Sequence, residues 1–167
     1  MRVWLAIGVT VWAAFALAGC GFQPLYGKTT AYDGVAADFG AIEIVDIPER
    51  VGLSVRNHLI DLMPQEGAAR YRLIVTLSEN REGLALRRDA SVTRYNYVLR
   101  ATFELRDAAT DAVVDKGHAR AIAAYNVVDS QFATLSAEQD AETRAARELA
   151  EQIRLRLGVG FERRTRG

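Results

Sequence analysis

Apolar and polar positions along the chain follow two periods, which predict six elements in the order β-α-β-β-β-α. A period of two indicates a half-buried strand, and apolar residues three or four apart indicate an amphipathic helix. The predicted strands cover 41–47, 71–78, 91–105 and 113–125, and the predicted helices cover 49–63 and 136–157.

The third predicted strand, 91–105, alternates most clearly. One face carries Thr93, Tyr95, Tyr97, Leu99, Ala101, Phe103 and Leu105, and the other carries Val92, Arg94, Asn96, Val98, Arg100, Thr102 and Glu104. One apolar and one polar face are typical of an antiparallel sheet that is covered on one side. We expect a turn over 80–89 before this strand, and a bulge at Gly117 in the next one.

Both predicted helices carry a single apolar stripe. In the first, the stripe lies between Pro48 and Pro64 and consists of Val51, Val55, Leu59 and Leu62. In the second, the residues repeat every four positions and are Ala137, Ala141, Ala145, Leu149, Ile153 and Leu157. The small alanines allow close approach to a sheet. Ser136 and Gln139 match a capping box at the helix start, and Gly158 and Gly160 are expected to end it.

Two helices with one apolar stripe each, and a sheet with one wet face, predict an α+β fold. We expect a two-layer α/β sandwich with about four strands in a mostly antiparallel or mixed sheet, and both helices packed on one face. This domain is expected to span 41–160 and to be followed by a basic tail, 161–167.

The N-terminal segment resembles a bacterial lipoprotein signal. An uncharged apolar stretch follows Arg2 and ends in small residues just before Cys20, the one cysteine of the chain. We predict that 1–19 is a signal peptide and that Cys20 begins the mature protein and carries a diacylglycerol thioether and an N-acyl chain. Two or more acyl chains anchor a protein stably in a membrane. Gly21 replaces the Asp of an inner-membrane retention signal, which favours the outer membrane. An uncleaved anchor helix with an incidental cysteine is the alternative.

Residues 20–40 are predicted to form a lipidated tether, because they contain several glycines and show no helical or strand period. Aromatic and apolar residues are unusual in a free linker. We therefore expect Phe22, Pro24, Leu25 and Tyr26 to dock against the domain or a partner.

The composition argues against several classes of function. The chain has 21 Lys and Arg and 21 Asp and Glu, and this balance argues against a nucleic-acid-binding protein. A single cysteine allows no intramolecular disulfide. His58 and His118 lack the partners that a metal site needs, and no nucleophile elbow is present. We expect no catalytic residue, no metal and no cofactor.

Arginines gather around the predicted turn: Arg81, Arg87, Arg88, Arg94 and Arg100. Guanidinium groups bind phosphate bidentately, so this hairpin end is a candidate site for an anionic lipid headgroup. A solvated hairpin tip is the alternative. A second basic group near the C-terminus could also meet phosphates, but it fits cations placed at a helix C-terminus: Arg154, Arg156, Arg163, Arg164 and Arg166.

The run Cys20-Gly21-Phe22-Gln23-Pro24-Leu25-Tyr26 resembles the mature start of the LPS-assembly lipoprotein family LptE, in its alphaproteobacterial form. The element order and the alanine-rich last helix agree with that family. The resemblance implies a lipoprotein without enzymatic activity, anchored in the outer membrane, with its domain inside a barrel or facing the periplasm. It also implies a 1:1 complex with the LptD β-barrel, which the lipoprotein plugs and helps to assemble, and binding of lipopolysaccharide.

Under this resemblance, the tether links the anchor to the domain, and the arginines at 81–100 contact lipid A or core phosphates. Two other functions stay open from the residues alone. One is a lipid-anchored adaptor of another cell-envelope complex, and the other is a periplasmic enzyme.

Overall fold

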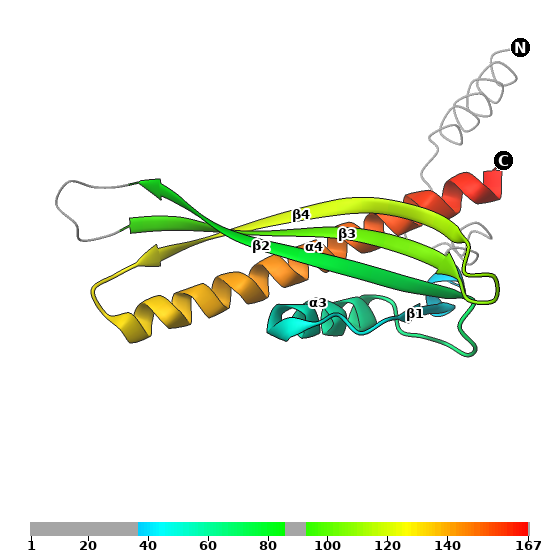
Figure 1. Ribbon diagram of the computed structural model, residues 1–167, viewed down its shortest axis with the longest axis horizontal. Coiled ribbons are helices and arrows are strands. Elements are labelled where there is room, and N and C mark those ends of the chain that lie inside the picture. Colours follow the sequence, from blue (N-terminus) through cyan, green and yellow to red (C-terminus); the bar gives the residue numbers. More distant parts are fainter. Residues whose placement is uncertain (1–36, 86–92, 167) are drawn as a thin grey trace, which may run out of the picture. The chain divides into compact units, whose positions relative to one another are not determined.

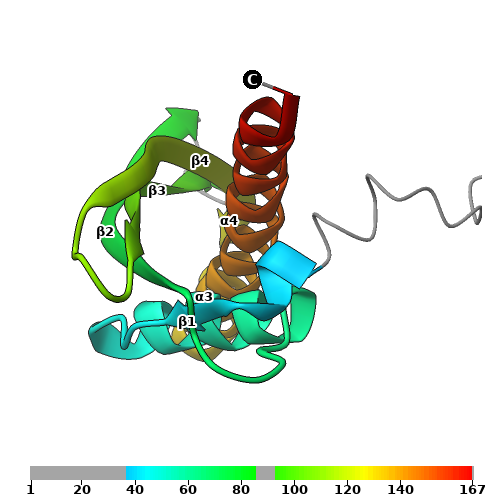
Figure 2. The same cartoon turned by 90° about the vertical axis from the view of Figure 1, so that its right-hand side faces the viewer.

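Four strands form one mixed sheet in the order β1-β2-β3-β4 (Figure 1). They are β1 (Ile42–Ile44), β2 (Tyr71–Ala85), β3 (Thr93–Asp107) and β4 (Val113–Val127). β1 runs parallel to β2, and the other neighbours are antiparallel. The two main helices, α3 (Glu49–Leu62) and α4 (Gln131–Arg166), contribute to the core on one face of the sheet (Figure 2). The predicted α+β sandwich is confirmed, with helical residues 37–40 as a small addition.

This computed structural model describes residues 37–85 and 93–166. The chain divides into two units, 1–30 and 31–167, and the fold is that of the second. The signal segment, Cys20, the tether residues up to 36, and Arg87 and Arg88 lie outside the described residues. Within the described ranges, no helix has both the length and the apolar content to cross a membrane.

The core lies between the helices and the inner face of the sheet, which carries odd-numbered positions of β2, β3 and β4 and even-numbered positions of β1. Leu99, Phe103 and Leu105 of β3 are buried, as their alternation predicted. The predicted stripe of α3 is also inward, with Val55 and Leu59 fully buried. On the other face of β3, polar side chains are exposed or half-buried, but Val98 is fully buried, contrary to its predicted wet position.

The alanine stripe of α4 packs closely, as predicted. Its buried residues are Ala141, Ala145, Ala146, Leu149, Ala150, Ile153, Leu157 and Phe161. Side chains of α4 also bond the outer edge of β4: Arg144 Nη2 donates to the Ala124 carbonyl at 3.1 Å, and Gln152 Oε1 accepts from the Arg120 N–H at 3.4 Å. These contacts occupy backbone groups that an edge strand otherwise leaves open.

Both predicted ends of α4 are wrong. The helix begins at Gln131, because Ser130 Oγ accepts the Ala133 N–H at 3.3 Å and so supplies a cap before Ser136. It passes through Gly158 and Gly160 and ends at Arg166, so 161–166 are helical. Phe161 explains the extension: its side chain is 2% exposed, and its ring lies 5.6 Å from both the Phe39 and Tyr71 rings. Tertiary packing overrides the low helix propensity of glycine.

The strands also differ from prediction in two places. Residues 80–85 continue β2 in place of the expected turn, because Asn80 and Glu82 pair with Val98 and Asn96 of β3. The irregularity of β4 lies near Val113, where the register against β3 shifts, and not at Gly117. Gly117 pairs directly with Phe103, and a Cβ there would lie 2.7 Å from that ring. The glycine is therefore needed to make room for the ring.

Candidate functional site

The arginines predicted as one patch are divided between the two faces of the sheet. Arg81 lies on the inner face beside Tyr97, with its guanidinium 5.9 Å from the ring centroid. Its Nε donates to Glu138 Oε1 of α4 at 2.5 Å. That hydrogen bond is the main cause of the raised pKa of Arg81. Arg81 is thus committed to an ion pair that joins β2 to α4.

Arg94 and Arg100 lie on the outer face of β3 and are both exposed. Arg100 Nη2 is 3.5 Å from Glu82 Oε1, so a carboxylate already accompanies it. The structure does not bring Arg81 together with these two residues. Whether any of the five predicted arginines binds phosphate stays a prediction.

Beside Arg81, the inner face carries a polar cluster that sequence reasoning missed. Tyr97 Oη donates to Glu79 Oε2 at 2.5 Å, and Arg50 at the start of α3 pairs with the buried Glu142 of α4. These residues come from four separate elements, so no local motif could have revealed the cluster. It ties both helices to the same end of the sheet.

The Tyr97 phenol gives this cluster a pH signature. Burial is the largest cause of its raised pKa, and the hydrogen bond to Glu79 adds to it. A raised pKa means that the folded state holds the phenol proton more tightly than the unfolded state does. The protonated Tyr97 phenol therefore contributes its full stabilisation of the folded state below the unfolded pKa of about 10. This contribution is lost as the pH rises beyond that value.

We accordingly expect the free energy of unfolding to fall above about pH 10, and Tyr97→Phe to flatten this decline. Urea denaturation at a series of alkaline pH values measures the slope. Tyr125, whose pKa is raised mainly by burial, remains in the variant and leaves a residual slope. An unchanged slope in Tyr97→Phe would contradict the assignment.

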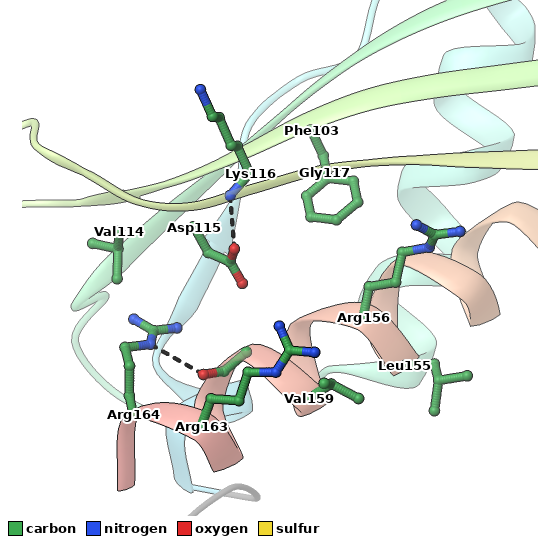
Figure 3. A pocket seen from close by; sticks show the side chains of 11 residues that line it. Phe103, Val114, Asp115, Lys116, Gly117, Leu155, Arg156, Val159, Arg163 and Arg164 are labelled. Carbon is green, nitrogen blue, oxygen red and sulfur yellow. Dashed lines mark hydrogen bonds between the residues drawn. The ribbon is translucent and has the colours of Figure 1, made fainter. Parts of the chain in front are cut away.

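At the C-terminal end of α4, a groove with a volume of about 600 Å³ opens between this helix and β4. Figure 3 shows its walls, which are made by the following residues: Phe103, Val114, Asp115, Lys116, Gly117, Leu155, Arg156, Val159, Gly160, Arg163 and Arg164. The volume is in the range of small-molecule sites. The groove combines apolar carbon with several charged groups.

Three guanidinium groups of α4 face this groove. Arg156, Arg163 and Arg164 turn toward β4, whereas the Lys116 side chain points away from α4 (Figure 3). Arg164 is held in place, because its Nε donates to the Gly160 carbonyl at 3.3 Å and its guanidinium lies 4.7 Å from the Phe161 ring centroid. Within 37–85 and 93–166, no carboxylate pairs with Arg156 or Arg163.

Two glycines shape the groove. A Cβ at Gly117 would meet the Phe103 ring, and a Cβ at Gly160 would lie 2.1 Å from Asp115 Oδ2. The sequence pattern treated Gly160 as a helix stop and Gly117 as a bulge. Each glycine makes room for a side chain of another element, Phe103 of β3 or Asp115 of β4, and these contacts join elements that are distant in sequence.

The described residues offer little for metal chemistry. No three side chains of His, Cys, Asp or Glu come together there in a way that could hold a metal ion. His58 is half-buried on α3 and His118 is exposed on β4.

The structure is thus a small α+β domain with an amphipathic groove between α4 and β4. The family model LptE, described as lipopolysaccharide-assembly, matches residues 39–157. The chain therefore belongs to the LptE family of lipopolysaccharide-assembly proteins, which are assembly factors and not an enzyme family. This places it in the cell envelope, with a role in lipopolysaccharide assembly.

The chain is also similar to solved structures. A Caulobacter crescentus CB15 chain, assigned as a lipoprotein, is 32% identical, with a TM-score of 0.62, and the match covers 75% of this chain and 93% of that one. Rare lipoprotein B from Shewanella oneidensis is 15% identical, with a TM-score of 0.46 and coverage of 76% and 98%. A minor lipoprotein from Acinetobacter baumannii is 15% identical, with a TM-score of 0.49 and coverage of 71% and 90%. No curated protein matches the chain.

Proposed function

We propose that this protein is an outer-membrane lipoprotein that binds lipopolysaccharide and plugs and helps to assemble an LptD-type β-barrel. The observation that carries the proposal is the family match over 39–157, which includes the sheet and most of both main helices. Cys20 would carry the acyl chains, and the tether with Phe22, Pro24, Leu25 and Tyr26 would lead from the anchor to the domain.

The domain is suited to binding rather than to chemistry. Its inner-face carboxylates and arginines are used in ion pairs that hold the elements together, as Arg81 with Glu138 and Arg50 with Glu142 illustrate. Such pairs stabilise a rigid scaffold on which a ligand or a barrel wall could rest. An adaptor of another envelope complex is the alternative that the same scaffold would serve.

Depletion of the protein is expected to lower surface lipopolysaccharide and the amount of mature barrel. The full-length chain, purified from membranes by an affinity tag, should bring down one large outer-membrane β-barrel in equimolar amount. Depletion of an unrelated outer-membrane lipoprotein is the control. Normal surface lipopolysaccharide and a normal barrel after depletion would overturn the proposal, and recovery with inner-membrane or peptidoglycan partners would favour the adaptor.

A further inference from the structure

We propose that the groove between α4 and β4 binds the phosphorylated headgroup of an anionic lipid, with phosphates on Arg156 and Arg163. The inference rests on the proposed function in one respect: the lipid would be the one that the protein helps to assemble. It does not follow from the family match, because Arg163 and Arg164 lie beyond residue 157, where that match ends.

The groove carries arginines that no carboxylate of the described residues neutralises. Several arginines of the described residues already have a carboxylate partner: Arg50, Arg56, Arg70, Arg72, Arg81, Arg100, Arg106 and Arg144. Arg156 and Arg163 differ from these, since no carboxylate of the described residues pairs with them, and both face the groove (Figure 3). A guanidinium can donate two parallel hydrogen bonds to a phosphate.

The spacing of these two arginines favours a ligand with two phosphates. They are seven residues apart on one helix, which is almost two full turns, or about 10.5 Å along the axis. They therefore share a face of α4, and their separation along the helix leaves room for two phosphates of one ligand. A headgroup phosphorylated at both ends could use each arginine separately.

Apolar surface lies beside these charges. Leu155 is 69% exposed and Val159 is 42% exposed, and both line the groove between and beside the arginines. The buried Phe103 ring adds an apolar base to the groove, where it packs against Gly117. A free inorganic anion would leave this apolar carbon in water, whereas the acyl chains of a lipid would cover it.

Asp115 offers a substitution that should strengthen binding in place of weakening it. It is the one carboxylate among the groove-lining residues, and its Oδ1 accepts the Lys116 N–H at 2.8 Å. A phosphate bound at Arg163 would be repelled by this carboxylate. Removing its charge should therefore tighten binding, whereas removing the arginine charges should weaken it.

The experiment measures binding of fluorescent bisphosphorylated lipid A to the full-length lipidated protein in detergent. A charge-assisted hydrogen bond contributes about 1.5–3 kcal/mol, so Arg156→Glu and Arg163→Glu should each weaken binding at least tenfold. Asp115→Asn should strengthen it. Arg147→Glu is the matched control, because Arg147 is exposed on the same helix outside the groove. All of these positions are at or near the surface, and thermal melts check that the fold is retained.

Two further ligands identify the source of the phosphate. Monophosphorylated lipid A should bind about tenfold more weakly than the bisphosphorylated form, because one arginine is left unused. Inorganic phosphate should not displace either lipid at comparable concentration. Displacement by inorganic phosphate would overturn the lipid site in favour of a simple anion site, and equal binding of both lipids would overturn the two-phosphate arrangement.

The groove and the proposed function can fail separately. If both Arg→Glu variants bind lipid A as the wild type does, or if Arg147→Glu weakens binding equally, the groove is not the site, although the protein still binds the lipid. If the wild-type protein binds no lipid A, both proposals are overturned. Loss of lipid A binding in the arginine variants, with barrel co-purification intact, supports the groove.

Discussion

Replacing Phe161 by alanine is expected to lower the free energy of unfolding by about 3–5 kcal/mol. The Phe161 side chain is 2% exposed and contacts the rings of Phe39 and Tyr71. Truncation removes this buried surface and leaves a cavity that the helix cannot easily fill. Urea denaturation followed by circular dichroism of the full-length chain measures the difference.

Phe132→Ala is the matched control, because it makes the same change at the other end of the same helix. Phe132 is 82% exposed, so its loss should alter the free energy of unfolding by no more than about 0.5 kcal/mol. Similar effects of the two substitutions would show that Phe161 does not contribute to the core. They would also show that the part of α4 after Gly158 and Gly160 stays helical without the Phe161 ring.

Gly117→Ala is expected to destabilise the domain by about 1–3 kcal/mol, as overpacking of a core does. The new Cβ would lie 2.7 Å from Cζ of Phe103, whose ring is buried and cannot move freely. The same substitution at Gly83 of β2 is the control, because its Cβ would lie 3.4 Å from the Tyr95 ring, which is only half-buried. Thermal or urea denaturation compares the two variants.

A double variant separates the clash from other effects of alanine. Phe103→Leu gives a smaller side chain opposite residue 117, so Gly117→Ala should cost less in that background than in the wild type. A double-mutant cycle measures this coupling between the two positions. Additive effects would mean that the ring contact is not the reason for glycine at 117.

The secondary structure was predictable wherever burial follows a simple period. The alternation from Tyr95 to Leu105 and the stripe of α4 both correspond to buried faces, because a sheet and a helix repeat with fixed geometry. The ends of elements were not predictable in the same way. Asn80 and Gly83 favour a turn locally, but pairing with β3 keeps them in a strand.

The arginine patch shows why sequence proximity misled. Once 80–85 are a strand, Arg81 follows the odd-numbered residues of β2 to the inner face, next to Tyr97. Arg94 and Arg100 are even-numbered positions of β3 and lie on the outer face. Treating 80–89 as a turn concealed this division. The groove was also not predictable, because Gly117 and Gly160 come from different elements and line the same groove only in the folded domain.

The two glycines inside α4 have a consequence for local unfolding. Each weakens a helix by about 1 kcal/mol relative to alanine, so 161–166 gain little from helix propensity and depend on the seating of Phe161. Melting of the last turns and release of this ring are therefore one event. Because Arg163 lies in those turns, any ligand that it holds would be released in the same event, and occupancy would in turn protect the helix end against fraying.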